Sequence, residues 1–133
     1  MRLEEAEARR RLGARRVVRL ATADAAGRPH LVVVTFALDG DRLFTAVDQK
    51  PKSTRDLKRL RNIHENPAVA ALADHYDEDW TRLWWVRADG TAHILTDPAE
   101  MAPPLALLQE RYAQYRADPP DGPVIAVEIA RWT

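Results

Sequence analysis

Two stretches of strand-forming residues, each built around an Asp-Gly pair, limit the possible folds more than any other feature of the chain. HLVVVTFALDGDRLFTAV covers residues 30–47, and RLWWVRADGTAHIL covers residues 82–95. Asp-Gly between two apolar runs is a strong hairpin signal, because both residues tolerate the backbone angles of a tight turn. The sequence therefore predicts a domain made mostly of antiparallel strands.

Three further segments are expected to be strands, since they are short runs rich in apolar residues. They are RRVVRLAT at 15–22, AVAALAD at 68–74 and GPVIAVEIARW at 122–132, which also alternates between apolar and polar residues. DAAGRP at 24–29 supplies a turn. HLVVVTFAL at 30–38 is apolar enough for one strand covered on both faces.

Helices are expected at 2–12, 53–63 and 98–117, where apolar residues recur at helical spacing or opposite charges lie four positions apart. The second is expected to begin at Ser53, which with Asp56 resembles a capping box. Six or seven strands with two or three helices predict an α+β, mostly β fold, a small antiparallel barrel with helices packed outside it. A sandwich is the alternative.

The length and composition limit the function as well as the fold. With 133 residues, one domain is expected over 1–133, with an N-terminal helix in 1–14 and the barrel with its helices in 15–133. Lysine plus arginine equals aspartate plus glutamate at 20 each, which argues against nucleic acid or a membrane surface as partner. The absence of cysteine and of any long apolar run favours a cytoplasmic protein.

No metal site is expected. The histidines are scattered, with no pair at a spacing typical of zinc ligands; they are His30, His64, His75 and His93. The acidic segment DHYDED at 74–79 lacks the glycine and the ligand order of a calcium-binding loop.

The strongest candidate binding site lies where Lys50 and Lys52 flank Pro51, directly before the expected helix at 53–63. Unpaired N–H groups in the first turn of a helix, together with nearby cations, suit a phosphate. Ser53 can cap the helix or bind the anion with its hydroxyl. The alternative is a solvated basic connection, and spacing alone does not decide between the two.

Tryptophan is frequent for a chain of this size, at positions 80, 84, 85 and 132. Trp84 and Trp85 are adjacent in an expected strand, so they must point to opposite faces of the sheet. One is expected to fill the barrel, and the other to meet solvent, a ligand or another subunit. Arg87 shares the face of Trp85.

Three parts of the sequence resemble a known family. They are GRPHLVVVTFALDGDRLFTAVDQKPKSTRDLKRLRNIHENPAVAAL, DHYDEDWTRLWWVRADGTA and ERYAQYR with the later GPVIAVEI. From about residue 15 onward the chain is similar to the flavin and deazaflavin oxidoreductases of the pyridoxamine 5'-phosphate oxidase-like split β-barrel superfamily. Within it, the VDQKPKS and DHYDEDW segments are most similar to the actinobacterial branch that depends on coenzyme F420, an 8-hydroxy-5-deazaflavin with a phosphate and a polyglutamate tail.

The resemblance implies a six-stranded split barrel, a homodimer and two cofactor sites at the subunit interface. It assigns the cofactor phosphate to Lys50 and Lys52, with Ser53 beside them. The remaining residues that it places near the ring are Thr22, Val34, Thr35, Phe36, Asp48 and Gln49. From the partner subunit it implies contributions by the tryptophan-rich strand, among Trp80, Trp84, Trp85 and Arg87.

The function that this resemblance implies is hydride transfer between reduced coenzyme F420 and a small organic acceptor. FMN in the same fold is the alternative cofactor, and a non-catalytic cofactor- or tetrapyrrole-binding protein is the alternative outside enzymes. No catalytic side chain is predicted, because the hydride chemistry belongs to the cofactor. A nucleic-acid-binding barrel is disfavoured by the neutral charge and by the lack of aromatic residues among the basic ones.

Overall fold

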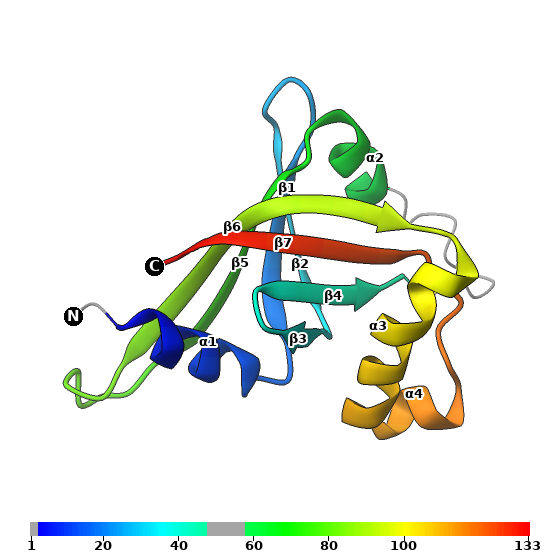
Figure 1. Ribbon diagram of the computed structural model, residues 1–133. Helices are drawn as coiled ribbons and strands as arrows, with labels where there is room; N and C mark the ends of the chain where they lie inside the picture. Colours follow the sequence, from blue (N-terminus) through cyan, green and yellow to red (C-terminus); the bar gives the residue numbers. More distant parts are fainter. Residues whose placement is uncertain (1–2, 48–57) are drawn as a thin grey trace.

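The computed structural model describes residues 3–47 and 58–133, which form one strongly curled antiparallel sheet with helices around it (Figure 1). Within these residues the strand order is β2-β1-β5-β6-β7-β4-β3. The strands are β1 (Val18–Ala23), β2 (Pro29–Val34), β3 (Ala37–Asp39), β4 (Arg42–Ala46), β5 (Ala68–His75), β6 (Trp84–Leu95) and β7 (Val124–Trp132). The helices are α1 (Glu5–Gly13), α2 (Lys58–Glu65), α3 (Pro98–Arg111) and α4 (Ala113–Ala117). The predicted mostly β, barrel-like fold with outer helices is confirmed, in the form of a half-barrel, and the sandwich is excluded because all described strands share one sheet.

The strand expected at 30–38 is divided between β2 and β3, and the described residues hold seven strands in all, within the expected six or seven. β2 pairs with β1 at one edge of the sheet, whereas β3 pairs with β4 at the other. Thr35 and Phe36 carry the chain from one edge to the other, across the opening of the curled sheet (Figure 1). Phe36 is fully buried there, and its N–H donates to the hydroxyl of Tyr112 over 3.1 Å.

Only one of the two Asp-Gly pairs forms a hairpin. Gly40 has a φ of 61° between β3 and β4, as a tight turn requires. The hairpin predicted at Asp89-Gly90 is wrong, because β6 runs through this pair without turning and has only a register shift there against β7. A Cβ atom on Gly90 would lie 2.3 Å from the carbonyl oxygen of Glu128. Glycine is therefore needed here for close approach of two strands, not for a turn.

The apolar residues form two clusters on opposite sides of β4 and β7. The larger fills the curled sheet and includes Leu12 of α1 and Ile63 of α2. The smaller lies under α3 and includes Leu108 and Tyr112. Because both faces of β7 are covered near its start, the four residues of 124–127 are all buried, and the alternation predicted for this strand holds only farther along it.

The helix boundaries differ from those expected in two places. The segment 98–117 forms two helices, because Tyr112 between them adopts an extended backbone with φ −122° and ψ 120°. The described part of α2 ends at Glu65, two residues beyond the expected end. The capping box predicted at Ser53 lies outside the described residues. No helix in the described part of the chain is both long and apolar enough to cross a membrane.

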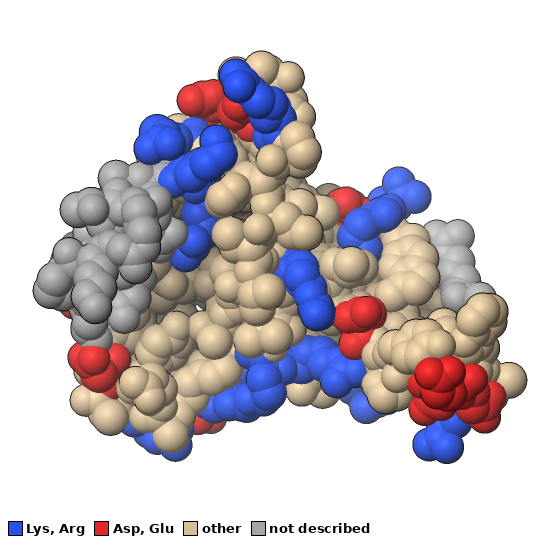
Figure 2. All heavy atoms as spheres, turned by 180° about the vertical axis from the view of Figure 1, so that it is seen from behind, with Lys and Arg blue, Asp and Glu red and all other residues tan. Residues whose placement is uncertain are grey.

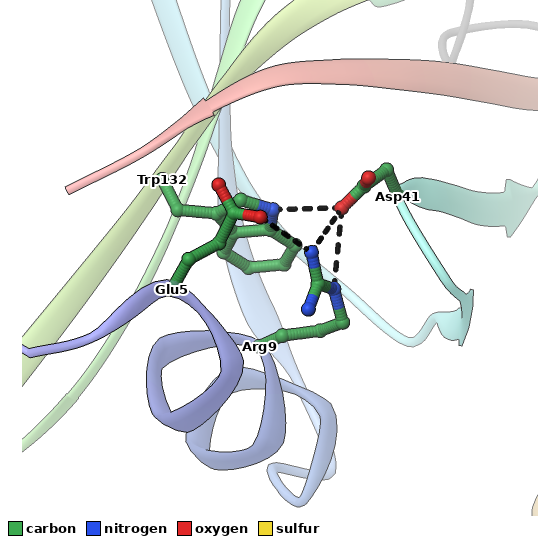
Figure 3. Close-up of polar contacts among 4 residues, drawn as sticks. All are labelled: Glu5, Arg9, Asp41 and Trp132. Atoms are coloured by element: carbon green, nitrogen blue, oxygen red, sulfur yellow. Dashed lines mark hydrogen bonds and ion pairs between the residues drawn. The ribbon is translucent and has the colours of Figure 1, made fainter.

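Asp41 ties α1 to the end of β7, as Figure 3 shows. Its Oδ1 accepts hydrogen bonds from Arg9 Nη2 at 2.7 Å and from Trp132 Nε1 at 2.9 Å. The Arg9 guanidinium also pairs with Glu5 and lies over the Trp132 ring, 5.4 Å from its centroid. These hydrogen bonds lower the pKa of Asp41 below its ordinary value, and the bond from Arg9 has a larger effect than the bond from Trp132.

The lowered pKa of Asp41 predicts how its contribution to stability depends on pH. A carboxyl whose folded pKa is depressed stabilises the protein above its unfolded pKa of about 3.9, and this contribution is lost as the pH falls through the folded value. We expect Asp41→Ala to lower the urea midpoint at pH 7, and the difference from wild type to shrink below about pH 4. An unchanged difference down to pH 2 would show that the carboxylate charge is irrelevant.

Candidate functional site

A cleft of about 270 Å³ lies between β2, β4, α2 and α4. The residues that line it come from four places in the sequence, and they are Val33, Val34, Thr35, Thr45, Ala46, Arg59 and Tyr115. The cleft forms where the end of β2 meets β4 across the opening of the curled sheet. We refer to it below as the β2–β4 cleft.

Two tyrosines fix the Thr35 side of the cleft: Tyr115 of α4, and Tyr112, which lies between α3 and α4. The Thr35 Oγ1 and the Tyr115 hydroxyl lie 2.7 Å apart, at hydrogen-bond distance. The Tyr115 ring packs edge-on against Tyr112, with the ring centroids 5.6 Å apart. The Tyr112 hydroxyl lies 2.7 Å from the carbonyl oxygen of Arg16 and 2.9 Å from that of Phe36, so it donates to one of them. The Thr35 hydroxyl is thus held by a network that reaches the backbone.

The chemistry of the β2–β4 cleft suits a flat, partly polar molecule with an anionic group. Val34 and Ala46 form an apolar part of its wall. Thr35 and Tyr115 contribute hydroxyl groups, and Arg59 contributes a guanidinium. Hydroxyls both donate and accept hydrogen bonds, and a guanidinium donates to carboxylate or phosphate. No group of three or more potential metal ligands occurs among residues 3–47 and 58–133.

Of the ring-binding residues that the resemblance implied, Val34 and Thr35 line this cleft. Phe36 is fully buried, and both its N–H and its carbonyl lie within hydrogen-bond distance of the Tyr112 hydroxyl. Thr22 is 4% exposed and accepts a hydrogen bond from Asn62 Nδ2 over 3.0 Å, which joins β1 to α2. The other predicted residues of this group lie outside the described residues, and they are Asp48, Gln49, Lys50, Lys52 and Ser53.

The tryptophan-rich strand contributes nothing to the lining of the β2–β4 cleft within one chain. Trp84 is partly buried and packs against the main core, whereas Trp85 is 50% exposed, so the prediction that they face opposite ways is confirmed. Trp80 is 71% exposed in the loop after β5. Arg87 donates from Nε to Asp89 over 3.1 Å. A role of these residues in a site shared with a second subunit stays a prediction.

The outer face of the sheet carries exposed apolar side chains on β2, β5 and β6. Residues directly opposite one another in antiparallel strands lie on the same face. Val33 of β2 pairs with Arg19 of β1, which pairs with Leu72 of β5, which pairs with Arg87 of β6. Side chains two positions apart in a strand also share a face, which adds Leu31 beside Val33 and Trp85 beside Arg87. The apolar side chains of this outer face are therefore Leu31, Val33, Leu72 and Trp85, each at least 38% exposed. Val33 also lines the β2–β4 cleft, so the cleft opens at the edge of this face.

Sequence reasoning missed the cleft residues Thr45, Arg59 and Tyr115. Arg59 belongs to the helix expected at 53–63, and nothing in its spacing separates it from the other basic residues there. Tyr115 belongs to the ERYAQYR segment of the family resemblance, and that was the available signal. Its role depends on α4 folding back toward β2, which no local pattern predicts.

Comparisons with known proteins agree with this architecture. The sequence model of the pyridoxamine 5'-phosphate oxidase family matches residues 4–133. No curated protein matches the sequence.

Among solved structures, HutZ, the heme storage protein from Vibrio cholerae, is 20% identical with a TM-score of 0.74, over 100% of this chain and 94% of HutZ. A FAD-binding protein from Mesorhizobium loti is 21% identical with a TM-score of 0.71, over 98% of this chain and 92% of that protein. The FAD binding protein from Mycobacterium smegmatis is 17% identical with a TM-score of 0.66, over 99% of this chain and 95% of that protein. At these identities the three similarities show a shared fold.

Proposed function

The chain belongs to the pyridoxamine 5'-phosphate oxidase family, and we propose that it is an oxidoreductase that uses coenzyme F420, with FMN as the alternative cofactor. The cofactor ring lies in the β2–β4 cleft, and the cofactor phosphate lies on Lys50, Lys52 and Ser53. The observation that carries this proposal is the position of Val34 and Thr35. Both are residues that the resemblance assigns to the ring, and both line one cleft beside a guanidinium and a tyrosine hydroxyl.

The β2–β4 cleft fits the ring of such a cofactor better than the whole molecule. Its volume of about 270 Å³ lies just below the range of about 300–1,000 Å³ typical of small-molecule sites. The rest of the cofactor therefore needs further binding surface, from the segment that joins β4 to α2 and from a second copy of the chain. This requirement agrees with the phosphate site proposed at Lys50 and Lys52.

The bound cofactor supplies the hydride, and the protein supplies orientation, exclusion of water and charge. The Thr35 hydroxyl, fixed by Tyr115, is placed to bond a polar edge of the ring. Val34 and Ala46 cover apolar ring surface and keep water away from it. The hydride acceptor is a small organic molecule. No side chain is assigned as a general acid or base.

Two observations bear on which cofactor is used. The VDQKPKS and DHYDEDW segments resemble the actinobacterial F420-dependent branch, which favours the deazaflavin. The two FAD-binding proteins of similar fold favour a flavin-type cofactor in general. The fold shared with a heme storage protein supports a second candidate, a non-catalytic tetrapyrrole-binding protein.

We also propose that the protein is a homodimer whose subunits meet through the outer face defined above. The charged side chains of that face are already paired within the chain, Arg19 with Asp74 at 3.0 Å and Arg87 with Asp89 at 3.1 Å. The apolar side chains between them have no cover from the described residues of the chain. Because Val33 belongs both to this face and to the β2–β4 cleft, a subunit docked here borders the cofactor site.

The dimer predicts that a charge on the outer face separates the subunits. We expect Trp85→Glu and Leu31→Glu each to raise the dissociation constant of the dimer about tenfold or more, because an unpaired charge would be buried at the interface. Light scattering over a concentration series measures this. Tyr76→Glu, an exposed position in the loop after β5, is the control. A wild-type protein that is monomeric at micromolar concentration, with and without cofactor, would overturn the proposal.

Turnover tests the proposed function. Reduced coenzyme F420 is mixed with the protein and with enones, quinones or biliverdin-like tetrapyrroles, and its reoxidation is followed by absorbance. Protein-dependent reoxidation with at least one acceptor is expected, and the same assay with reduced FMN decides between the cofactors. If neither cofactor is bound while heme is, the tetrapyrrole-binding candidate replaces the enzyme.

The hydroxyl that fixes Thr35 provides a test of the ring position. We expect Tyr115→Phe to weaken binding of the cofactor by about three- to tenfold, because it releases the Thr35 hydroxyl from its partner. Tyr76→Phe removes a hydroxyl from an exposed loop residue and serves as the matched control. Equal affinities of both variants and wild type would place the ring elsewhere.

A further inference from the structure

A second basic site lies at the C-terminal end of α1, and it shares no lining residue with the β2–β4 cleft. It is a groove of about 440 Å³ between the end of α1, the end of β5 and the start of β6. We call it the Arg15 groove, and its lining residues are Arg10, Arg11, Ala14, Arg15, His75, Arg82 and Trp84. A neighbouring cleft of about 330 Å³ also contains Arg15, together with Arg16 and Arg19. Figure 2 shows how basic side chains gather along the lower edge of this side of the molecule.

The Arg15 groove has more positive than negative charge. Arg10 and Arg11 share one carboxylate, that of Glu7, at 2.5 and 2.6 Å. The two guanidiniums hold the pKa of Glu7 down at about 2, so this carboxylate is ionised at neutral pH. Arg82 pairs with Asp77 at 3.8 Å.

Arg15 has no carboxylate partner among the described residues. Its guanidinium lies 4.9 Å from the centroid of the Trp84 ring, and its buried Nε has no hydrogen-bond partner. Four guanidiniums thus face two carboxylates, and this excess suits a ligand with two negative charges.

The backbone that carries Arg15 is held from the interior of the protein. Arg111 donates from Nη1 to the carbonyl oxygen of Gly13 over 2.7 Å and from Nη2 to that of Arg15. The Tyr112 hydroxyl reaches the carbonyl oxygen of Arg16 at 2.7 Å. With these carbonyls bound inward, the connection between α1 and β1 is fixed, and a ligand need not order it on binding.

The wall of the groove is also fixed. The Trp84 ring packs against the main core, and His75 stacks on it with the ring centroids 6.4 Å apart. Arg11 and Arg15 both lie over this ring, at 5.6 and 4.9 Å from its centroid. A guanidinium positioned on an aromatic face keeps its N–H groups available to a carboxylate or phosphate in its own plane.

We propose that the Arg15 groove binds a compact dianion, either a phosphate ester or a dicarboxylate, independently of the cofactor site. Arg15 and Arg82 approach the anion from the two sides of the groove, and Arg10 and Arg11 add charge at its rim. The site shares no residue with the phosphate site proposed at Lys50 and Lys52. Its test therefore needs no cofactor and no turnover.

Trp84 serves as a built-in reporter for the test. The indole N–H signals of the protein are recorded by NMR, and that of Trp84 is assigned with Trp84→Phe. Inorganic phosphate and succinate are titrated separately at constant ionic strength, with chloride as the reference anion. We expect a saturable shift of the Trp84 signal with phosphate, with succinate or with both, and the better probe identifies the class of ligand.

Variants separate a built site from general charge screening. Arg82→Gln and Arg15→Gln are expected to weaken binding of the effective probe about tenfold or more, since each removes a charge-assisted hydrogen bond. Arg82 has a side chain that is 73% exposed, so its replacement leaves the fold intact even if Arg15→Gln disturbs the packing on Trp84. Arg28→Gln, in the turn between β1 and β2 with a side chain 81% exposed, is the matched control. The absence of any saturable shift, or equal weakening by Arg82→Gln and Arg28→Gln, would overturn the proposal.

Discussion

Replacing Lys50 or Lys52 by alanine is expected to weaken binding of coenzyme F420 by about ten- to a hundredfold. Each lysine is proposed to contact the cofactor phosphate, and a hydrogen bond between charged groups contributes on the order of 1.5 to 3 kcal/mol. The free energy of unfolding is expected to change little in both variants. Affinity is measured by titrating each variant with the cofactor, and circular dichroism verifies the fold.

The control for these variants lies on α2, the helix that follows the two lysines in the chain. Arg61 is exposed on α2, and Arg61→Ala should leave the affinity within a few fold of wild type. Raising the salt concentration should weaken the wild type more than either lysine variant, because the lysine charges are what salt screens. If both lysine variants kept wild-type affinity and an intact fold, the proposal that Lys50 and Lys52 bind the cofactor phosphate would be wrong.

The second large effect is expected at Gly90, where alanine should destabilise the protein by about 3 kcal/mol. The added Cβ atom would lie 2.3 Å from the carbonyl oxygen of Glu128 and 2.9 Å from a methyl group of Val127. The first contact is with backbone, so relief requires β6 and β7 to separate near the centre of the sheet. Urea denaturation of the variant and of wild type measures the loss.

Gly13→Ala is the matched control for Gly90→Ala. Gly13 is the last residue of α1, and its added Cβ would lie 3.2 Å from a methyl group of Leu38, a side chain that can move. Alanine in a helix is favoured over glycine by about 1 kcal/mol, so the control should be neutral or slightly stabilising. If Gly90→Ala were as stable as wild type, the close approach of β6 and β7 could not be as described.

The sequence was a sound guide to the fold class, because the turn at Gly40 and the apolar runs are local signals. The prediction from sequence was wrong at Gly90. The Asp-Gly pair there makes no turn, and Gly90 instead allows close approach of Glu128, a residue far away in the chain. Composition cannot separate a glycine needed for a turn from one needed for a close approach. The division of the strand at 30–38 has the same kind of cause, since it follows from the curl of the whole sheet.

The candidate site was predictable only where the family resemblance reached it. Val34 and Thr35 were assigned to the ring on that resemblance, and they line the cleft. Arg59 and Tyr115 join them from helices that are distant in the sequence, and only the folded chain brings them together. The arginines of the Arg15 groove are visible in the sequence, but only the fold brings Arg82 and Trp84 beside Arg15.

The central claim is that the β2–β4 cleft holds the ring of a deazaflavin or flavin, and one titration tests it most directly. The purified protein is titrated with coenzyme F420, FMN and heme side by side, and the absorbance of each ring is followed. We predict saturable binding of one F420 per chain, tighter than that of FMN and weakened by Tyr115→Phe. Saturable binding of heme, without binding of either F420 or FMN, would contradict the account.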